Sequence, residues 1–209
     1  MTQWDQILPE KEYSPREPDE PVVSFINSLQ KKKGIRALDL ACGTGRHVVY
    51  IAEQGFDANG ADASDTGLKL TRERLRKRKL PADLVRCDMN HLPYVDHCFD
   101  TVICTRAIYH QKQKGIKTTL SEIRRILRKH GRVLVDFLSR RTYSYGKGVE
   151  VERDTFVETE GHEKGVLHHF VDKQEIEILF SRFKIADIAL KQREIDGKLR
   201  SRWTATAMA

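Results

Sequence analysis

The stretch that decides the fold of this 209-residue chain begins at residue 38. It is Leu38-Asp39-Leu40-Ala41-Cys42-Gly43-Thr44-Gly45-Arg46-His47. The apolar segment 36–42 predicts a short strand that ends in a glycine turn, and residues 45–54 predict a helix after it. Gly43 and Gly45 allow a tight turn and the close approach of a ligand to the backbone. The helix that follows presents free N–H groups to the same place, so the turn is a candidate ligand site.

Strands and helices alternate along the rest of the chain. Further strands are predicted at 57–62, 82–87, 101–105, 132–138, 184–195 and 199–207, and helices at 22–33, 64–80, 116–129 and 172–180. This alternation predicts a parallel sheet with helices on both faces. Asp196-Gly197 predicts a hairpin between the last two strands, which adds an antiparallel strand. We therefore expect one doubly wound α/β sheet of about seven strands.

The rest of the domain organisation follows from composition. Residues 1–21 contain four prolines and are expected to form an irregular arm. With the helix predicted next, residues 1–34 form an N-terminal arm and helix over the ligand site, and residues 35–209 form the main domain. Residues 139–171 are polar and aromatic without clear periodicity. We expect them to be an insertion or lid on the substrate side.

Three acidic residues stand at the ends of three successive predicted strands. Asp39 precedes the glycine turn, Asp62 ends the second strand, and Asp88 follows the third, with Met89 after it. Ligands of such sheets bind outside the carboxyl ends of the strands, where these side chains meet. One carboxylate suits an amine, one the two hydroxyls of a ribose, and one an adenine amino group. Each acid alone is better explained as a helix cap or a solvated loop residue, but three of them at the same edge of the sheet favour a ligand site.

A dinucleotide is a less suitable ligand for this turn. The third glycine of the Gly-x-Gly-x-x-Gly pattern is absent, since Val48 stands there. An NAD-dependent oxidoreductase is therefore disfavoured.

The successive motifs resemble those of the class I S-adenosylmethionine-dependent methyltransferases. The resemblance covers roughly residues 35–138 and rests on Leu38–His47, Gly60-Ala61-Asp62-Ala63-Ser64, Cys87-Asp88-Met89, Leu92-Pro93-Tyr94, Phe99-Asp100 and Arg124–Val135. It implies a Rossmann-like fold, S-adenosyl-L-methionine as cofactor and S-adenosyl-L-homocysteine as product. Families with this pattern commonly have glycine where this chain has Ala41.

The resemblance also implies the residues that surround the cofactor. The glycine turn would surround the methionine part, Asp62 the ribose, and Asp88 with Met89 the adenine. Thr105 and Arg106 would line the floor near the sulfonium, and Tyr13 would close over the methionine end. The implied cofactor-binding residues are Tyr13, Asp39, Ala41, Cys42, Gly43, Thr44, Gly45, His47, Asp62, Ala63, Cys87, Asp88, Met89, Thr105 and Arg106.

The methyl acceptor is not specified by these motifs. Tyr109 and His110 follow the fourth strand and are the first candidates to face it, and His169 is a candidate base. His110 is equally well explained as a loop histidine. No metal site is expected, because His168-His169 has no clear third ligand. Since no further binding module accompanies the core, we expect a small-molecule acceptor.

Two other functions stay open. Residues 69–79 hold seven basic side chains against Glu73 alone, which accounts for most of the net charge of +7. This helix could dock RNA or a protein substrate for methylation, although such a charge run is more often a solvated face. The chain could also bind S-adenosylmethionine without turnover.

Simple features of the sequence indicate where the protein is expected to be located. No apolar run approaches the ~20 residues of a membrane span, and no secretory signal is visible at the N-terminus. The four cysteines lack paired spacing, which favours free thiols in a cytoplasmic protein. The sequence leaves the oligomeric state open.

Overall fold

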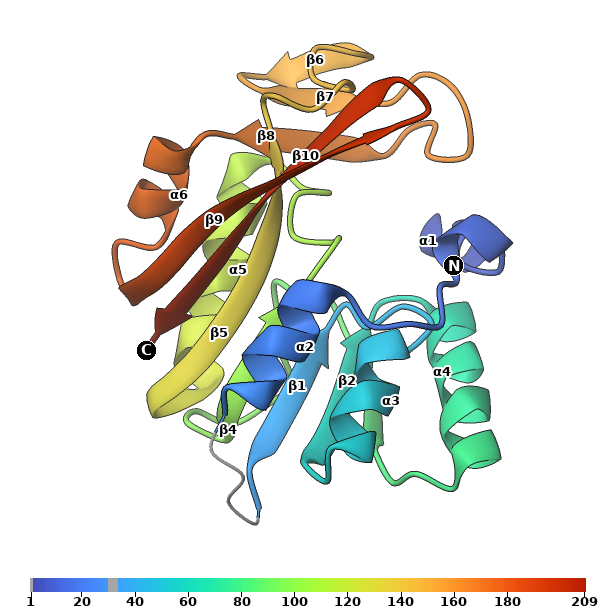
Figure 1. Ribbon diagram of the computed structural model, residues 1–209, viewed down its shortest axis with the longest axis vertical. Coiled ribbons are helices and arrows are strands. Elements are labelled where there is room, and N and C mark those ends of the chain that lie inside the picture. Colours follow the sequence, from blue (N-terminus) through green and yellow to red (C-terminus); the bar gives the residue numbers. More distant parts are fainter. Residues whose placement is uncertain (1, 30–33) are drawn as a thin grey trace.

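The computed structural model describes residues 2–29 and 34–209 (Figure 1). The helices are α1 (Trp4–Ile7), α2 (Glu20–Asn27), α3 (Arg46–Glu53), α4 (Asp65–Arg78), α5 (Gln113–Ile126) and α6 (Lys173–Leu179), with a 3-10 turn η1 (Lys11–Tyr13). The strands are β1 (Arg36–Leu40), β2 (Asp57–Asp62), β3 (Asp83–Arg86), β4 (Phe99–Cys104), β5 (Leu127–Ser139), β6 (Val149–Glu152), β7 (Thr155–Val157), β8 (Leu167–Val171), β9 (Lys184–Ile195) and β10 (Lys198–Met208).

The predicted α/β sheet is confirmed. β3, β2, β1, β4 and β5 lie side by side in that order and are all parallel. β10 pairs antiparallel with β5, and β9 pairs antiparallel with β10. The turn between β9 and β10 is the predicted Asp196-Gly197, with both residues at positive φ. These seven strands form the expected mostly parallel sheet with an antiparallel hairpin at one side.

Two apolar clusters cover the two faces of the sheet, because successive side chains of a strand point to opposite faces. In β5, Val133 and Val135 belong to the cluster that contains α5, and Leu134 belongs to the cluster that contains α2, α3 and α4. Helices therefore lie on both faces, as Figure 1 shows for α2 and α3 in front and α5 behind. Both clusters consist of residues that are almost fully buried.

The segment 139–171 is more regular than expected. It contains β6, β7 and β8, which form an antiparallel ladder at the top of Figure 1. β8 joins the main sheet through the pairs Leu138–Phe170 and Ser139–Val171. The expectation of a segment without periodicity is therefore wrong. The three strands are short, and a period of two is hard to recognise over so few residues.

Three expected element boundaries also change. The helix predicted at 116–129 ends at Ile126, and β5 has begun before Gly131, the residue expected to stop that helix. Of the helix predicted at 22–33, α2 ends at Asn27, and residues 30–33 lie outside the described residues. The arm, expected to be irregular, contains α1.

None of the described helices is both long enough and apolar enough to cross a lipid bilayer.

Candidate cofactor site

A cavity of about 350 Å³ lies at the carboxyl ends of β1, β2, β3 and β4. This is where the alternation of strands and helices places a ligand. α1 lies above it in Figure 1. The residues that line it are Trp4, Leu8, Leu40, Ala41, Gly43, Ala61, Asp62, Ala63, Cys87, Asp88, Met89, Arg106, Ala107, His110 and Gln111.

The turn after β1 forms one wall of the cavity in a backbone conformation that favours glycine. Ala41, Gly43 and Gly45 all have positive φ, at 60°, 53° and 82°. A Cβ at Gly45 would lie 2.4 Å from the Thr71 side chain of α4, so this glycine cannot be replaced without moving that helix. Ala41 has the left-handed conformation although it carries a Cβ. Glycine adopts this conformation without steric cost, so it is well suited to this position.

Asp62 connects this turn to the start of α4. Its Oδ2 accepts a hydrogen bond from the Gly43 N–H at 2.7 Å, and its Oδ1 accepts one from the Ser64 N–H at 2.8 Å. Burial raises the pKa of the carboxyl group, while these backbone N–H groups oppose the rise. Asp62 lines the cavity, so its carboxylate is held rigidly where a diol can bind.

Asp39 lies just behind the turn and is almost completely buried. Among the described residues, its Oδ2 has no hydrogen-bond partner. Burial raises the pKa of this carboxyl group to about 8, and Arg46 acts in the opposite direction. An unpaired buried carboxyl oxygen is costly, so a donor beside it would be stabilising. A ligand that brings an ammonium group to this end of the cavity fits this arrangement.

The wall that follows β3 suits a flat, apolar ring with a polar edge. Met89 lines the cavity, and its sulfur lies 3.2 Å from the Gln111 side-chain amide, which donates toward it. Asp88 also lines the cavity; its Oδ1 accepts the Asn90 N–H at 2.9 Å and the side chain is largely exposed. It retains acceptor capacity for a ligand donor.

Arg106 lies at positive φ after β4 and lines the cavity. It donates to Asp19 at 2.8 Å, and Arg46 donates to the same carboxylate at 2.6 Å. His47 is buried beside them, and its Nε2 accepts the Asp19 N–H. Burial, then Arg46, lowers the pKa of His47 to about 3, so the ring is neutral. This cluster ties the arm to the floor of the site.

The arm reaches the cavity through α1, a helix that the sequence analysis did not predict within residues 1–21. Trp4 and Leu8 line the cavity from above. Asp5 fixes α1 in place, because its Oδ1 accepts the Ser64 hydroxyl at 2.6 Å and the Thr66 N–H at 3.1 Å. The signal available in the sequence was the i, i+3, i+4 spacing of Trp4, Ile7 and Leu8, which is short but helical.

The structure divides the predicted cofactor residues into two groups. Those in the cavity lining are Ala41, Gly43, Asp62, Ala63, Cys87, Asp88, Met89 and Arg106. Those outside the lining are Tyr13, Asp39, Cys42, Thr44, Gly45, His47 and Thr105. Of the second group, Asp39 lies near the end of β1, the residues from Cys42 to His47 lie in the turn after β1 or at the start of α3, and Thr105 directly follows β4. Tyr13 stands over the 139–171 segment, with its ring 6.4 Å from that of His162.

The three candidate catalytic residues have different surroundings. His110 lines the cavity, with its ring 4.7 Å from that of Trp4. Tyr109 is buried, and its hydroxyl accepts from Arg202 at 2.5 Å. His169 is buried away from the lining, and its two ring nitrogens contact Thr155 at 2.6 Å and Glu175 at 2.9 Å. The geometry therefore brings only His110 of the three to the cavity.

Known proteins that resemble this chain include methyltransferases. Residues 37–131 match the family model described as "Methyltransferase domain". The protein YqeM of Bacillus subtilis is 28% identical over 158 residues, which cover 74% of this chain and 61% of that protein. The demethylmenaquinone methyltransferase of Lactobacillus johnsonii is 35% identical over 114 residues, covering 52% of this chain and 46% of that protein.

The fold is shared over a longer stretch. The solved structure of an S-adenosylmethionine-dependent methyltransferase from Methanosarcina mazei superposes with a TM-score of 0.77 and 18% identity, covering 92% of this chain and 98% of that one. The chain spans about three-fifths of the length of the first curated relatives that it matches. Residues 37–131 therefore form a methyltransferase domain, and the fold around them is the one seen in this S-adenosylmethionine-dependent methyltransferase.

Proposed function

We propose that the protein transfers the methyl group of S-adenosylmethionine to a small-molecule acceptor. The observation that carries the proposal is the cavity of about 350 Å³, which is lined by the acidic residues Asp62 and Asp88 together with Trp4 and His110. Its volume is in the range of small-ligand sites. A relative named as a demethylmenaquinone methyltransferase supports an acceptor of this class.

The residues of the cavity fit the cofactor. Asp62 would take the ribose hydroxyls, and Met89 with Asp88 would hold the adenine. The unpaired Oδ2 of Asp39 favours an ammonium group near the turn. When bound, the cofactor supplies an activated methyl group, so the chain mainly has to orient the acceptor and exclude water.

Two segments that are far apart in the sequence contact each other. Gln3 of the arm donates to the Lys164 carbonyl, and Glu10 contacts His162 at 2.8 Å. Both partners belong to the 139–171 segment, which the sequence predicts to lie on the substrate side. A cover built from these two segments would restrict access to the methyl group, and this favours a small acceptor.

His110 is the residue we assign to the acceptor. Its Nδ1 lies 3.0 Å from the Leu167 carbonyl, which requires a proton on Nδ1 and leaves the lone pair on Nε2. Burial, then the neighbouring His168, lowers the pKa of His110 to about 3. The ring is therefore neutral at physiological pH and presents its Nε2 lone pair as a hydrogen-bond acceptor that can orient the methyl acceptor.

The basic helix supports a second candidate, methylation of RNA or protein. Lys69, Arg72 and Arg76 of α4 are exposed and could contact phosphates. A third candidate is binding of the cofactor without turnover. The three candidates predict different fates of the methyl group: transfer to a small molecule, transfer to RNA or protein, and no transfer.

The test follows the methyl group from labelled S-adenosylmethionine into a cell extract separated into small molecules, RNA and protein. We expect label in the small-molecule fraction, and about tenfold less of it with His110→Phe, which keeps an aromatic ring but removes the hydrogen-bond acceptor. That variant should bind the cofactor within about twofold of the unchanged chain, since the lost hydrogen bond acts on the methyl acceptor. Label confined to RNA or protein, or cofactor binding without any transfer, would contradict the proposal.

A further inference from the structure

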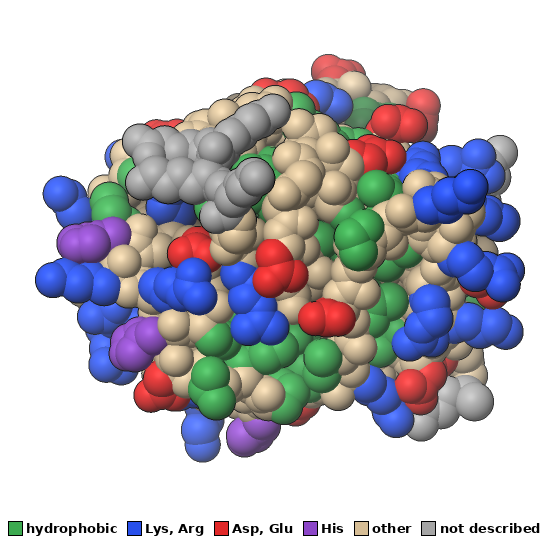
Figure 2. Space-filling model, turned by 90° about the horizontal axis from the view of Figure 1, so that it is seen from below, with side chains coloured by type: hydrophobic (Ala, Val, Ile, Leu, Met, Phe, Trp, Pro, Cys, Tyr) green, Lys and Arg blue, Asp and Glu red, His purple; other side chains and the backbone are tan. Residues whose placement is uncertain are grey.

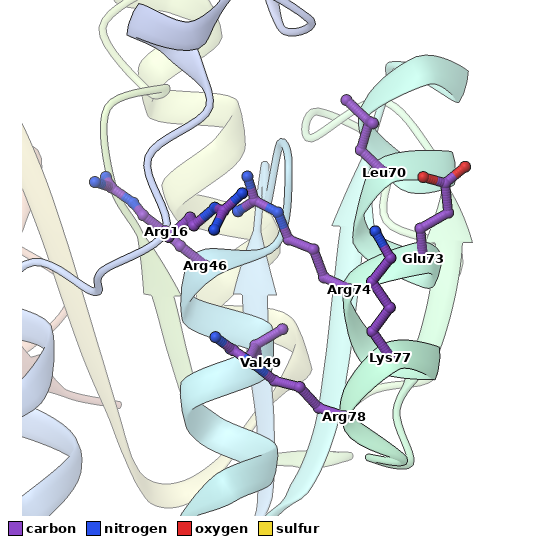
Figure 3. Close-up of a pocket in the computed structure, with 8 residues that line it drawn as sticks. All are labelled: Arg16, Arg46, Val49, Leu70, Glu73, Arg74, Lys77 and Arg78. Carbon is purple, nitrogen blue, oxygen red and sulfur yellow. The ribbon is translucent and has the colours of Figure 1, made fainter.

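A second cavity, of about 370 Å³, lies between the arm, α3 and α4 (Figure 3). Its residues come from all three elements and are dominated by cations: Arg16, Arg46, Val49, Leu70, Glu73, Arg74, Lys77 and Arg78. It lies in a region rich in basic side chains; in Figure 2 the Lys and Arg side chains crowd the right side, where α4 lies. Unlike the rest of that region, this part is hollow.

Arg74 is the fixed donor of this cavity. Its guanidinium donates to the Pro15 carbonyl at 2.8 Å, the Ser14 carbonyl at 3.0 Å and the Ser14 hydroxyl at 2.7 Å. Burial lowers the pKa of Arg74, and the nearby charges of Arg16 and Arg78 lower it further. The chain therefore holds like charges close together, and an anion bound among them would be stabilising.

The charges of the cavity are only partly neutralised by the protein. Arg46 is paired with Asp19, and Arg78 lies 3.4 Å from Glu53. In the part of the chain that the structure describes, no carboxylate lies within 4 Å of the charged atoms of Arg16, Arg74 or Lys77. Glu73 is the acidic residue in the lining, and its carboxylate points away from the guanidinium groups in Figure 3.

We propose that this cavity is a second binding site, for a small anion that carries phosphate groups. Guanidinium groups match phosphate oxygens in both charge and geometry, and a lysine ammonium adds a further donor. Cations from three elements converge on one hollow, which suits a compact ligand. A nucleic acid would instead follow an extended surface, such as the exposed row Lys69, Arg72 and Arg76 on another face of α4.

This site is separate from the cofactor cavity, with which it shares no lining residue. The turn after β1 lies between them: Gly43 lines the cofactor cavity, and Arg46, at the start of α3, lines the basic one. Thr71 of α4 braces the turn by donating to the Gly43 carbonyl at 2.9 Å. The proposal therefore holds whether or not the methyl acceptor is a small molecule.

The test is calorimetry with inorganic pyrophosphate at physiological salt, which screens diffuse surface attraction. The cavity variant is Arg16→Gln with Lys77→Gln, and the matched control is Lys69→Gln with Arg72→Gln. Both pairs remove two positive charges from exposed side chains, so folding is not at risk, and thermal unfolding checks this. Cofactor affinity, measured in parallel, should stay unchanged in both.

We expect saturable binding of one pyrophosphate, weakened about tenfold or more by the cavity pair and less than about twofold by the control pair. Absence of saturable binding up to about 10 mM would overturn the proposal. Equal weakening by both pairs would also overturn it, because the charge of the whole helix would then be responsible. Preferential binding of a single-stranded RNA, lost with the control pair, would assign the surface to nucleic acid instead.

Discussion

The floor and the cover of the cofactor cavity differ in how they are built from the chain. The floor comes from one continuous stretch, residues 40–111, in which each strand end contributes its loop to the same edge of the sheet. The cover joins the arm to the 139–171 segment through Gln3 with Lys164 and Glu10 with His162, pairs that are 161 and 152 residues apart in the sequence. The floor thus depends on a regular local pattern, and the cover depends on a few long-range contacts.

This difference separates what the family shares from what is particular to this chain. The matched family domain covers residues 37–131, which includes the whole floor and neither part of the cover. We therefore expect the floor to bind the cofactor. We expect acceptor choice to follow from the cover, and the predictions below perturb the two parts separately.

The largest effect is expected in the cover, from Arg140→Met. Arg140 contacts Asp154 at 2.9 Å, Asp172 at 2.5 Å and Glu175 at 2.8 Å, and so ties the 139–171 segment to α6. Its removal leaves three carboxylates without their cation, and we expect a loss of about 3 kcal/mol in the free energy of unfolding. Urea unfolding measures this.

The neighbouring residue is the control for this change. Arg141 is exposed, and Arg141→Met should change the free energy of unfolding by less than about 0.5 kcal/mol. Equal effects of the two substitutions would show that the ion-pair cluster does not hold the cover.

The second-largest effect is expected in the floor, on the affinity for the cofactor. Asp62→Ala should weaken binding of S-adenosylmethionine about 100-fold, because a charged hydrogen-bond acceptor for the ribose is lost. Asp57, at the exposed start of the same strand, is the matched control, and Asp57→Ala should leave the affinity unchanged. Calorimetry that finds the same affinity for both variants would remove Asp62 from the site.

The third-largest effect is expected on the stability of the folded protein at acidic pH. The pKa of His47 is lowered to about 3 in the folded protein and is near 6.5 in the unfolded chain. Between these values only the unfolded chain takes up the proton, so this contribution to stability is present above pH 6.5 and is lost as the pH falls toward 3. From pH 7 to pH 5 the loss is about 2 kcal/mol.

The variant His47→Gln separates this residue from other acid effects. We expect its stability to fall by about 2 kcal/mol less than that of the unchanged chain between pH 7 and pH 5. His91 is mostly exposed, and His91→Gln should behave like the unchanged chain. A similar pH dependence of all three proteins would contradict a buried, neutral His47.

The smallest effect concerns the contact between cover and floor. Trp4→Ala should weaken cofactor binding about tenfold, since it removes apolar surface above the cavity. Trp4→Phe keeps an aromatic ring there and should restore most of the affinity. If calorimetry finds Trp4→Ala unchanged, α1 does not act as a cover.

Most of the floor could be predicted from the sequence, and most of the cover could not. The positions of Gly43, Asp62 and Asp88 follow from local patterns, because parallel strands place their loops at a common edge. The partners of Asp5 and Gln3 are set by tertiary packing, which no local pattern encodes. The strands between residues 149 and 171 are too short for their periodicity to be recognised.

The candidate catalytic residues also could not be ranked from local sequence patterns. His110 and His169 both lie on predicted loops or strand ends, and their residue type alone gives no reason to prefer one. The fold turns His169 toward Thr155 and Glu175, and it turns His110 toward Trp4 and the cavity. The side to which a histidine points depends on strand pairing over long separations, here the pairing of β7 with β8.

The central claim is that the floor of the cavity binds S-adenosylmethionine. It is tested most directly by calorimetry of the unchanged protein with S-adenosylmethionine, S-adenosylhomocysteine and NAD. The account predicts dissociation constants on the order of micromolar for the first two, and no detectable binding of NAD. Binding of NAD, or no binding of either sulfur compound, would contradict it.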